Sequence, residues 1–309
     1  MMKNIASITP IDSLLADYQT HLLNNAGIAP STCKRRAFYA RSFLTALFKP
    51  KARSLDFQKI TAEALLNFVL EQTQTLSMNT MHTAASCLRC FCKFLCLGGH
   101  LPNDVSQAIP RIGSRGRDKL PTYLSRQEVQ RLLDSFSGHT PSDLRNYAAV
   151  LCLAKLGLRI GELARLALDD IDWRAGTLCL SQTKSRRDRQ LPLPEEVGRA
   201  LVRYLRQARP DTESRRVFVC LQDGKPLHPE SLASMTKRAM ARAGITAPRK
   251  GPHLLRKTMA SHLVQRGIPL KAVADLLGHT NLNTTQIYAK VDLPLLKQVA
   301  MPWPKEVRR

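Results

Sequence analysis

A break in hydrophobic periodicity between Pro102 and Pro121 constrains the fold more than any other feature, because it divides the chain into two parts. The break carries glycines and basic residues: Arg111, Gly113, Arg115, Gly116, Arg117 and Lys119. Such a composition is typical of a linker. A chain of 309 residues is also long enough for two domains with separate cores. We therefore predict a helical domain over residues 1–101, a basic interdomain linker over 102–120 and a second domain over 121–309.

The part before the break has the periodicity of α-helices and almost no strand signal. Apolar residues recur at helical spacing in four segments, Ile11–Asn25, Ser31–Phe48, Thr61–Gln74 and Met78–Leu97. Ser31 and Thr61 each stand at the start of a periodic segment, where a hydroxyl can accept a hydrogen bond from the first turn. We predict both residues as N-caps of a helical domain.

The part after the break mixes helices with a few short strands. Ser125 and Glu128 have the spacing of a capping box, and a second helix runs through SDLRNYAAVLCLAKLG towards Arg159. Strands are predicted at 171–173, 177–181, 190–193 and 217–220. Further helices are predicted at 194–207, 229–243, 253–266, 270–277 and 283–290. The expected fold class is α+β, mainly helix with one small sheet.

The net charge of the chain indicates a polyanionic partner. Lys and Arg number 47 against 24 Asp and Glu, which gives +23. In a compact protein, this many excess cationic side chains repel one another unless a polyanion offsets their charge. We therefore expect DNA or RNA as the partner. The alternative is a basic protein that is merely soluble. No run of about 20 apolar residues and no signal-peptide pattern is present, so we expect a cytoplasmic protein without a membrane partner.

Eight cysteines are expected to be thiols in that compartment: Cys33, Cys87, Cys90, Cys92, Cys96, Cys152, Cys179 and Cys220. Cys87 and Cys90 have CxxC spacing, but a metal site usually needs a second pair, and none with suitable spacing follows. Cys87 also shares a helical spacing with Phe91, Phe94 and Leu95, which is typical of core packing. We therefore expect no metal site here.

Two basic segments are candidates for DNA contact. The second helical segment interleaves Lys34, Arg35, Arg36 and Arg41 with the aromatic residues Phe38, Tyr39 and Phe43. A solvated basic face on a core helix explains this pattern equally well. In the predicted linker, Arg115 and Arg117 would gain from proximity to phosphate if the chain closed around a duplex.

Six residues recur in a fixed order through the second half of the chain: Arg159, Lys184, His253, Arg256, His279 and Tyr288. Together they supply cations for a phosphate that gains charge, a proton donor, a proton acceptor and a nucleophile. His253 and Arg256 are three residues apart at a predicted helix start, so they share a face, and the helix terminus adds partial positive charge. This set predicts cleavage of a phosphodiester without metal or another cofactor.

Each of the six residues also has a structural explanation. Arg159 can pair with Glu162, which lies three residues along the chain, and Lys184 can be a solvated turn residue beside Arg186 and Arg187. His279 can satisfy carbonyls at a helix end, and Tyr288 can be a core tyrosine. It is the ordered set that favours the catalytic interpretation over these alternatives.

The wording around these residues, LGLRIGELARL, TKSRRDRQLPLP, HLLRKT and LLGHTNLNTTQIY, resembles the tyrosine recombinases, also called the phage-integrase family. The resemblance covers about residues 121–291. It implies that Arg159 and Arg256 clamp the scissile phosphate and that His279 donates a hydrogen bond to it. It also implies that Lys184 protonates the departing 5′ oxygen, His253 is the general acid or base, and Tyr288 is the nucleophile.

The resemblance further implies a fold and a reaction. The expected fold is a helical, SAM-like core-binding domain joined to a catalytic domain with a C-terminal tail, forming a clamp around double-stranded DNA. The expected reaction is two transesterifications through a 3′-phosphotyrosyl intermediate, with no ATP or metal. Family members act as tetramers on two DNA sites, and an apolar stripe, Leu293, Leu296, Val299 and Met301, can dock in a neighbour or in its own domain.

Three functions are compatible with this resemblance. The first is a site-specific recombinase or integrase of a mobile element, plasmid or chromosome, with or without other recombinases or DNA-bending proteins. The second is a DNA-binding accessory factor that keeps the fold and forms no covalent adduct. The third is a type IB topoisomerase, which relaxes supercoils without sequence preference. Chain length and the two-domain layout favour the first.

Overall fold

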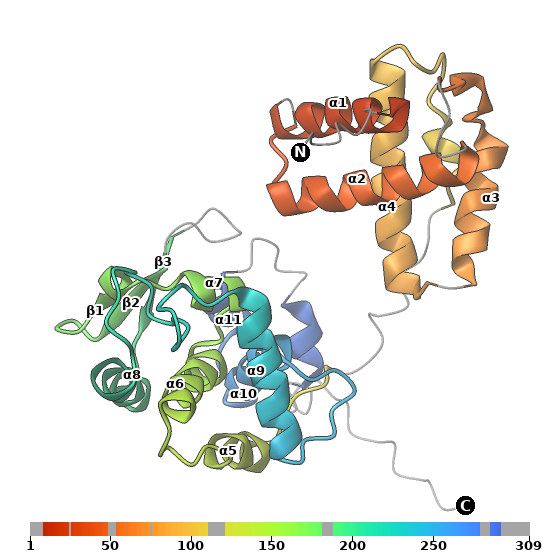
Figure 1. Cartoon of the computed structure of the whole chain (residues 1–309). Helices are drawn as coiled ribbons and strands as arrows, with labels where there is room; N and C mark the ends of the chain where they lie inside the picture. Colours follow the sequence, from red (N-terminus) through yellow and green to blue (C-terminus); the bar gives the residue numbers. More distant parts are fainter. Residues whose placement is uncertain are drawn as a thin grey trace, which may run out of the picture. The chain divides into compact units, whose positions relative to one another are not determined.

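The residues of the computed structural model fall into two units, Met1–Asp118 and Lys119–Arg309, which we describe separately (Figure 1). The structure describes residues 9–24, 26–48, 54–74, 76–110, 121–180, 188–278 and 285–291. Arg115, Arg117, Lys184, His279 and the apolar stripe after Tyr288 lie outside the described residues. The contacts thus divide the chain within the predicted linker.

The first unit is built from four α-helices, as the periodicity predicted. They are α1 (Pro10–Asn24), α2 (Pro30–Leu47), α3 (Ala62–Thr73) and α4 (Met78–Leu97), with short 3₁₀ helices at Phe57–Lys59 and Val105–Ala108. Tyr18, Phe43 and Phe91 are fully buried between α1, α2 and α4, and the ring of Tyr18 meets that of Phe91 edge to face at 5.0 Å. This aromatic core holds the unit together.

The helix starts of this unit confirm one predicted cap and correct the other. The hydroxyl of Thr61 accepts the N–H of Ala64 at 3.1 Å and caps α3. Ser31 is not an N-cap, because α2 begins one residue earlier at Pro30 and its cap residue is Ala29. Proline has no N–H to satisfy and a φ already suited to a helix, so it takes the first helical position and moves Ser31 into the first turn.

Two of the four cysteines of α4 are buried in the core, among them Cys87 as expected. Cys87 and Cys92 are buried with Phe91 and Leu95. Burial raises the pKa of the Cys92 thiol to about 12. All eight cysteines of the chain are free thiols. In the segments that the structure describes, no group of His, Cys, Asp or Glu has the arrangement of a metal site.

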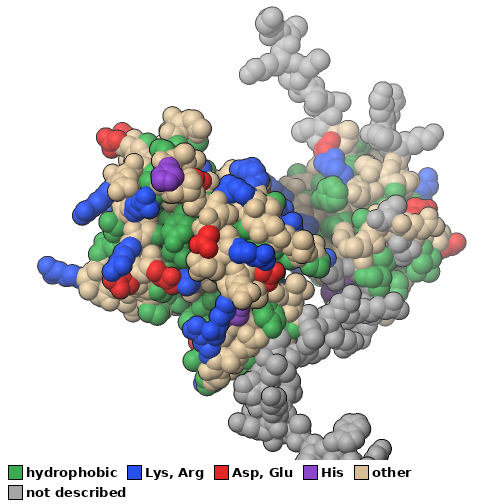
Figure 2. Space-filling model, turned by 90° about the horizontal axis from the view of Figure 1, so that it is seen from below, with side chains coloured by type: hydrophobic (Ala, Val, Ile, Leu, Met, Phe, Trp, Pro, Cys, Tyr) green, Lys and Arg blue, Asp and Glu red, His purple; other side chains and the backbone are tan. Residues whose placement is uncertain are grey.

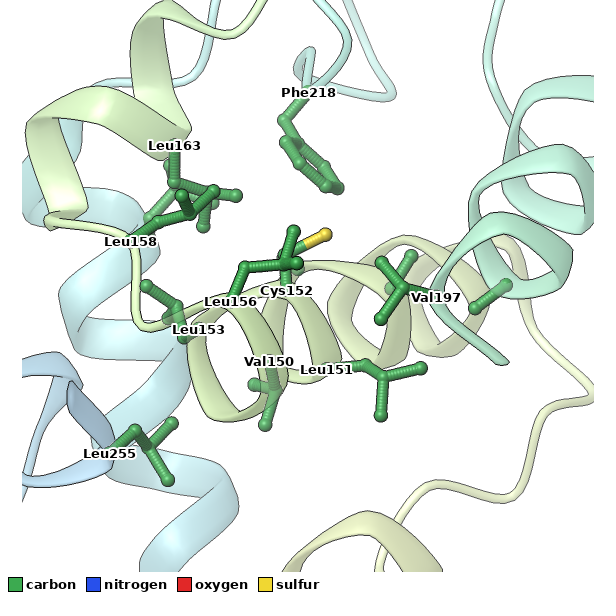
Figure 3. Packing of buried hydrophobic residues seen from close by; sticks show 14 of the residues in the cluster. Val150, Leu151, Cys152, Leu153, Leu156, Leu158, Leu163, Val197, Phe218 and Leu255 are labelled. Carbon is green, nitrogen blue, oxygen red and sulfur yellow. The ribbon is translucent and has the colours of Figure 1, made fainter. Parts of the chain in front are cut away.

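The second unit surrounds a helix that is buried on nearly every side. Its helices are α5 (Arg126–Asp134), α6 (Pro141–Leu156), α7 (Ile160–Arg165), α8 (Glu195–Gln207), α9 (Pro229–Arg242), α10 (Pro252–Gln265) and α11 (Leu270–Leu277). Residues 148–153 of α6 are all buried, and Val150, Leu151 and Leu153 point to different sides of the helix (Figure 3). An all-round apolar helix is typical of a core element. Ser125 and Glu128 form the predicted capping box of α5.

A small antiparallel sheet lies at one side of this unit (Figure 1). It has the order β1 (Ile171–Asp172), β2 (Thr177–Leu180) and β3 (Arg189–Pro192), and Leu180 pairs with Arg189 across β2 and β3. These are the three strands predicted at 171–193. Lys184 therefore belongs in sequence to the connection between β2 and β3.

Two predicted elements of the second unit differ in the structure. Residues 217–220 form no strand, although Val217, Phe218 and Val219 are fully buried. Val219 makes only an isolated bridge to Pro226, and proline has no N–H with which to extend a ladder. The helix predicted at 283–290 is a 3₁₀ helix over Gln286–Val291 where it is described.

The surface of the second unit carries its charge in a dispersed pattern. Figure 2 shows Lys and Arg side chains spread over the visible face, with apolar patches between them. Within the described ranges, no helix combines the length and the apolar composition needed to cross a bilayer.

Candidate active site

The first residue of the site, Arg159, lies at a sharp turn between α6 and α7. Helix α6 ends at Leu156, the left-handed φ of 61° at Gly157 turns the chain, and Leu158 is buried next to it. Arg159 then precedes the first residue of α7, and its backbone N–H donates to Glu162 Oε2 at 2.8 Å. Glycine takes this conformation without the steric cost that a side chain would add. The turn fixes the backbone from which Arg159 projects.

Glu162 is a buried carboxylate held by two arginines. Its oxygen Oε1 accepts from Arg159 Nη1 at 2.7 Å, and Oε2 accepts from Arg189 Nη2 at 2.7 Å. Only 2% of the Glu162 side chain is exposed. A buried charge is costly unless it is paired and hydrogen-bonded, and Glu162 meets both conditions. The structural explanation for Arg159, a pair with Glu162, is therefore confirmed as a contact.

The second arginine, Arg256, reaches the same turn from α10. Its Nη1 donates to the carbonyl of Gly157 at 2.6 Å, and its Nη2 donates to the carbonyl of Leu277. Arg159 Nη2 donates to the next carbonyl, that of Gly278, at 2.7 Å. The two arginines thus bind neighbouring carbonyls at the end of α11. Each guanidinium has five N–H donors, so each keeps donors for another acceptor.

The charges in this cluster do not balance. Arg159, Arg189 and Arg256 lie close enough to influence one another, and Glu162 is the carboxylate among them. Burial and the Arg159 charge lower the pKa of Arg256 to about 10, and Glu162 partly opposes this. Even so, Arg256 is charged at neutral pH. Two positive charges therefore remain in excess within the described part of the cluster, which favours binding of an anion.

His253 lies at the start of α10, next to the cap residue Gly251 and Pro252. The residue as a whole is exposed, but partial desolvation of its ring and the charges of Lys257 and Arg256 lower the pKa of His253 below 6.5. The imidazole is therefore neutral at pH 7 and can accept a proton. Because His253 precedes Arg256 by one turn, both residues share one side of α10 as predicted.

Tyr288 lies in the 3₁₀ helix Gln286–Val291 and is only 4% exposed. It packs in a cluster with Met259, Val264, Val273 and Leu277, which come from α10 and α11. Burial raises the pKa of Tyr288, while the charge of Arg256 lowers it. Tyr288 is thus packed in the core, as the structural alternative predicted, and it also lies close enough to Arg256 to feel its charge.

The structure brings four of the six predicted residues into one neighbourhood: Arg159, His253, Arg256 and Tyr288. Lys184 and His279 lie outside the described residues, although they flank described parts of the site in sequence. Lys184 belongs to the connection before Arg189, and His279 directly follows Gly278. His262, in contrast, bonds the carbonyl of Leu124 at 2.9 Å, as expected for a structural histidine.

The predicted DNA-contact residues of the first unit lie on α2. Lys34, Arg35 and Arg41 are exposed and Arg36 is half-buried, while Phe38 between them is 63% exposed. Arg41 pairs with Asp12 at 2.6 Å, a surface pair that contributes little to stability. An exposed basic and aromatic face is thus present, and its role as a DNA contact stays a prediction.

Sequence reasoning missed two members of the cluster, Arg189 and Gly278. Arg189 is two residues before the buried Leu191 in β3, so strand alternation places both on one face, and this signal was available. Gly278 ends α11 with a φ of 63°, and glycine after a helix is a common stop signal. Neither signal indicates by itself that the residue contacts the site.

Comparison with known proteins places the chain among recombinases. The profile of the phage integrase family matches residues 122–293. A Sinorhizobium fredii protein provisionally named integrase/recombinase y4rA is 36% identical over 94% of this chain and 71% of that protein. The tyrosine recombinase XerA of Thermococcus onnurineus is 28% identical over 93% of this chain and 94% of that protein.

Solved structures show the same fold. The XerH site-specific recombinase bound to its palindromic difH substrate matches with a TM-score of 0.74 and 22% identity, over 94% of this chain and 85% of that chain. The Tn1549 transposon integrase in complex with transposon right end DNA matches with a TM-score of 0.70 and 17% identity, over 92% and 99%.

Proposed function

This chain belongs to the phage integrase family of tyrosine recombinases, and from this premise we propose that it cuts and rejoins double-stranded DNA at specific sites. The observation that carries the proposal is the buried cluster in which Arg159 and Arg256 leave positive charge in excess beside Tyr288. We place this activity in a mobile element or plasmid, and the integrase names of relatives support the mobile element.

In the proposed first step, Tyr288 Oη attacks the scissile phosphorus. The bond between phosphorus and the 5′ oxygen breaks, and the 3′ phosphate becomes linked to the tyrosine. Because burial raises the pKa of Tyr288, its hydroxyl is protonated at neutral pH and must lose the proton to an acceptor. We assign this acceptor role to the neutral imidazole of His253.

Arg159 and Arg256 hold the phosphate in this proposal. The charge on its non-bridging oxygens grows in the transition state, and guanidinium donors fixed beforehand stabilise that charge. Hydrogen bonds to Gly157, Leu277 and Gly278 fix both guanidiniums in the structure. His279 adds a further hydrogen bond to the phosphate.

Lys184 protonates the departing 5′ oxygen. In the second step a 5′ hydroxyl of another strand attacks the phosphotyrosine, and the phosphodiester forms again as Tyr288 leaves. One phosphodiester is exchanged for another through a covalent bond to the protein, so the energy of the bond is retained. The scheme therefore consumes no ATP and uses no metal.

We further propose that the first unit and the basic linker contact the duplex. Lys34, Arg35, Arg36 and Arg41 lie on α2, and Arg115 and Arg117 belong to the predicted linker. With the catalytic unit they would form a clamp on DNA, and a homotetramer on two DNA sites would exchange strands. Solved relatives in complex with their DNA support the DNA partner.

Covalent adduct formation tests the proposed function. Nicked duplexes made from the DNA that flanks the gene are mixed with wild type and with Tyr288→Phe, and adducts that resist SDS are measured. We expect an adduct with the wild type and none with the variant. Tyr147→Phe, a tyrosine in contact with Phe136 and away from the cluster, is the matched control and should form the adduct at the wild-type level.

Two other outcomes would redirect the proposal. Tight binding without an adduct on any flanking duplex would contradict it and support an accessory DNA-binding factor. Relaxation of supercoiled DNA of arbitrary sequence at the same rate as cleavage of flanking DNA would support a topoisomerase. An adduct that persists in Tyr288→Phe would remove Tyr288 as the nucleophile.

A further inference from the structure

Arg189 lies in β3, outside the six-residue set, yet it is built into the cluster. Its side chain is 9% exposed, and its Nη2 donates to Glu162 Oε2 at 2.7 Å. Its Nε and Nη1 have no hydrogen-bond partner among the described residues. Burying a guanidinium with two unused donors is costly, so the contacts that it does make need an explanation.

Arg189 touches both groups that hold the side chain of Arg159. One is Glu162, which accepts from Arg159 Nη1. The other is Gly278, whose carbonyl accepts from Arg159 Nη2. A Cβ placed on Gly278 would lie 2.5 Å from Arg189 Nη1, so the guanidinium fills the space beside this glycine. Arg189 therefore contacts Glu162 and Gly278, the two residues that accept hydrogen bonds from the side chain of Arg159.

The shared carboxylate gives Arg189 an electrostatic consequence. Glu162 Oε1 accepts from the side chain of Arg159, while Oε2 accepts from the backbone N–H of Arg159 and from the side chain of Arg189. Without Arg189, the single negative charge of Glu162 would be offset mainly by Arg159. The positive potential that Arg159 presents to an anion would then be largely cancelled.

We propose that Arg189 is a positioning residue that offsets the charge of Glu162, so that Arg159 keeps its own charge for the scissile phosphate. The guanidinium of Arg189 also packs beside Gly278, whose carbonyl accepts from Arg159. The inference rests on the proposed role of Arg159 as a phosphate clamp. In this proposal a side chain of β3 offsets the charge of Glu162, which lies on α7.

The first experiment measures inorganic phosphate binding, which needs no cleavage. Phosphate is titrated at constant ionic strength, and affinity is obtained from the shift in thermal unfolding. Arg159→Gln should weaken binding and thereby locate the site. Arg189→Gln should weaken it about 10-fold, by analogy with the loss seen when a residue that orients a metal ligand is removed. Arg189→Lys keeps the charge and should bind nearly as wild type.

Two further variants separate charge compensation from a general structural effect. The double variant Glu162→Gln with Arg189→Gln removes both charges and should bind phosphate better than Arg189→Gln alone. Arg209→Gln removes an arginine that bonds the carbonyls of Ser214 and Arg216 away from the cluster, and it should bind phosphate as wild type. Wild-type affinity in Arg189→Gln, or no recovery in the double variant, would overturn the inference.

The second experiment uses the covalent reaction. Adduct rates are measured on a nicked duplex and on the same duplex with a methylphosphonate at the mapped cleavage position. Arg189→Gln should slow adduct formation roughly 10- to 100-fold on the phosphate. On the neutral methylphosphonate the difference from wild type should shrink, because less charge needs to be compensated. An equal defect on both substrates would indicate a merely structural role and contradict the inference.

The two experiments keep the two proposals apart. If the wild type forms no adduct, the proposed function fails, and the phosphate titration still decides the role of Arg189. If the wild type forms adducts and Arg189→Gln matches it in both assays, only the inference about Arg189 fails.

Discussion

Arg256 donates a hydrogen bond of 2.6 Å to the carbonyl of Gly157, although 99 positions separate the two residues in sequence. The bond joins α10 to the turn from which Arg159 projects. The turn has little freedom, because a Cβ on Gly157 would meet Leu277 Cδ2 and Met259 Sδ at 3.1 Å. The positions of the two arginines are therefore set by one tightly packed turn.

Arg159→Lys should keep DNA binding and lose most cleavage. Lysine carries its donors on a single nitrogen and lacks the planar fork, so it cannot reproduce the two bonds that separate nitrogens of Arg159 make to Glu162 and to the carbonyl of Gly278. We expect adduct formation to fall about 100-fold or more, as when one fixed donor to a developing charge is lost. Binding and adduct rates on flanking DNA measure the two effects.

The control for this variant is Arg165→Lys. Arg165 ends the short helix α7 that Arg159 precedes, and it is exposed. It should form the adduct at the wild-type rate. Equal cleavage by wild type and Arg159→Lys would remove Arg159 from the active site.

Gly278→Ala should destabilise the second unit and impair cleavage together. The residue has a φ of 63°, which a side chain rarely adopts, and the new Cβ would lie 2.5 Å from Arg189 Nη1. Backbone strain of this kind costs about 1 kcal/mol or more, and the collision adds to it. Thermal or urea unfolding gives the stability, and adduct formation gives the effect on the site.

Gly267→Ala separates backbone strain from collision. Gly267 has a similar φ of 79°, but among the described residues no atom beyond its chain neighbours lies within 4 Å of the position of a Cβ. This control should lose about 1 kcal/mol and keep its adduct rate once the protein is folded. A similar loss of stability and activity in both variants would contradict the role given to the contact with Arg189.

The pH dependence of cleavage should reflect His253. Partial desolvation and the charges of Lys257 and Arg256 lower the pKa of His253 below 6.5, so the neutral base is available throughout neutral pH. With His253 as the base, its titration should make cleavage decline on the acid side, below pH 6.5. Stability follows the same sign: the unfolded state takes up this proton first, so the contribution is complete above pH 6.5 and lost as pH falls through the folded pKa.

Charge and ring variants identify the group responsible for that decline. Lys257→Gln removes a charge that lowers the pKa of His253, so its acid limb should move to higher pH. His253→Gln should be slow and lack the limb. His262→Gln should leave the limb in place, because His262 bonds Leu124 outside the cluster, although its own pKa is also lowered by burial. An acid limb that survives in His253→Gln would assign the titration to another group.

Local patterns predicted most of the helices and the three strands because each signal acts within a few residues. Thr61 and the pair Ser125 and Glu128 cap their helices through bonds three residues apart. The strand predicted at 217–220 failed for the opposite reason, since a ladder needs a partner, and Pro226 cannot extend one. The apolar residues at 217–219 indicated that the segment is buried, but they did not indicate whether it pairs with another strand.

The site was predictable where side chains stand in an ordered motif and hidden where they meet through the fold. The order of the residues and the sequence around them predicted Arg159, His253, Arg256 and Tyr288, and the structure places these four in one neighbourhood. The bonds from Arg256 to Gly157 and from Arg189 to Glu162 depend on how α10 and β3 pack against the turn at Arg159. No local pattern in the sequence carries that information.

The chain that follows the linker is anchored to α10 by a buried hydrogen bond. Thr258→Val should reveal how much this bond contributes to the free energy of unfolding. The hydroxyl of Thr258 accepts the N–H of Leu124 at 2.9 Å. Valine fills nearly the same volume but leaves this buried N–H without a partner, which costs about 1–3 kcal/mol. Urea unfolding should show this loss, while the adduct rate of the folded protein stays near wild type, because the described hydrogen bonds of the Thr258 hydroxyl go to the backbone of Leu124 and Leu254.

Thr236→Val is the matched control for that anchor. Thr236 is equally buried, but its hydroxyl only donates to the carbonyl of Leu232 within α9 and satisfies no donor elsewhere in the described residues. Its replacement should therefore change stability by well under the cost of an unpaired buried group. If both variants lose the same stability, the bond to Leu124 is not what anchors the chain, and hydroxyl loss in general explains the effect.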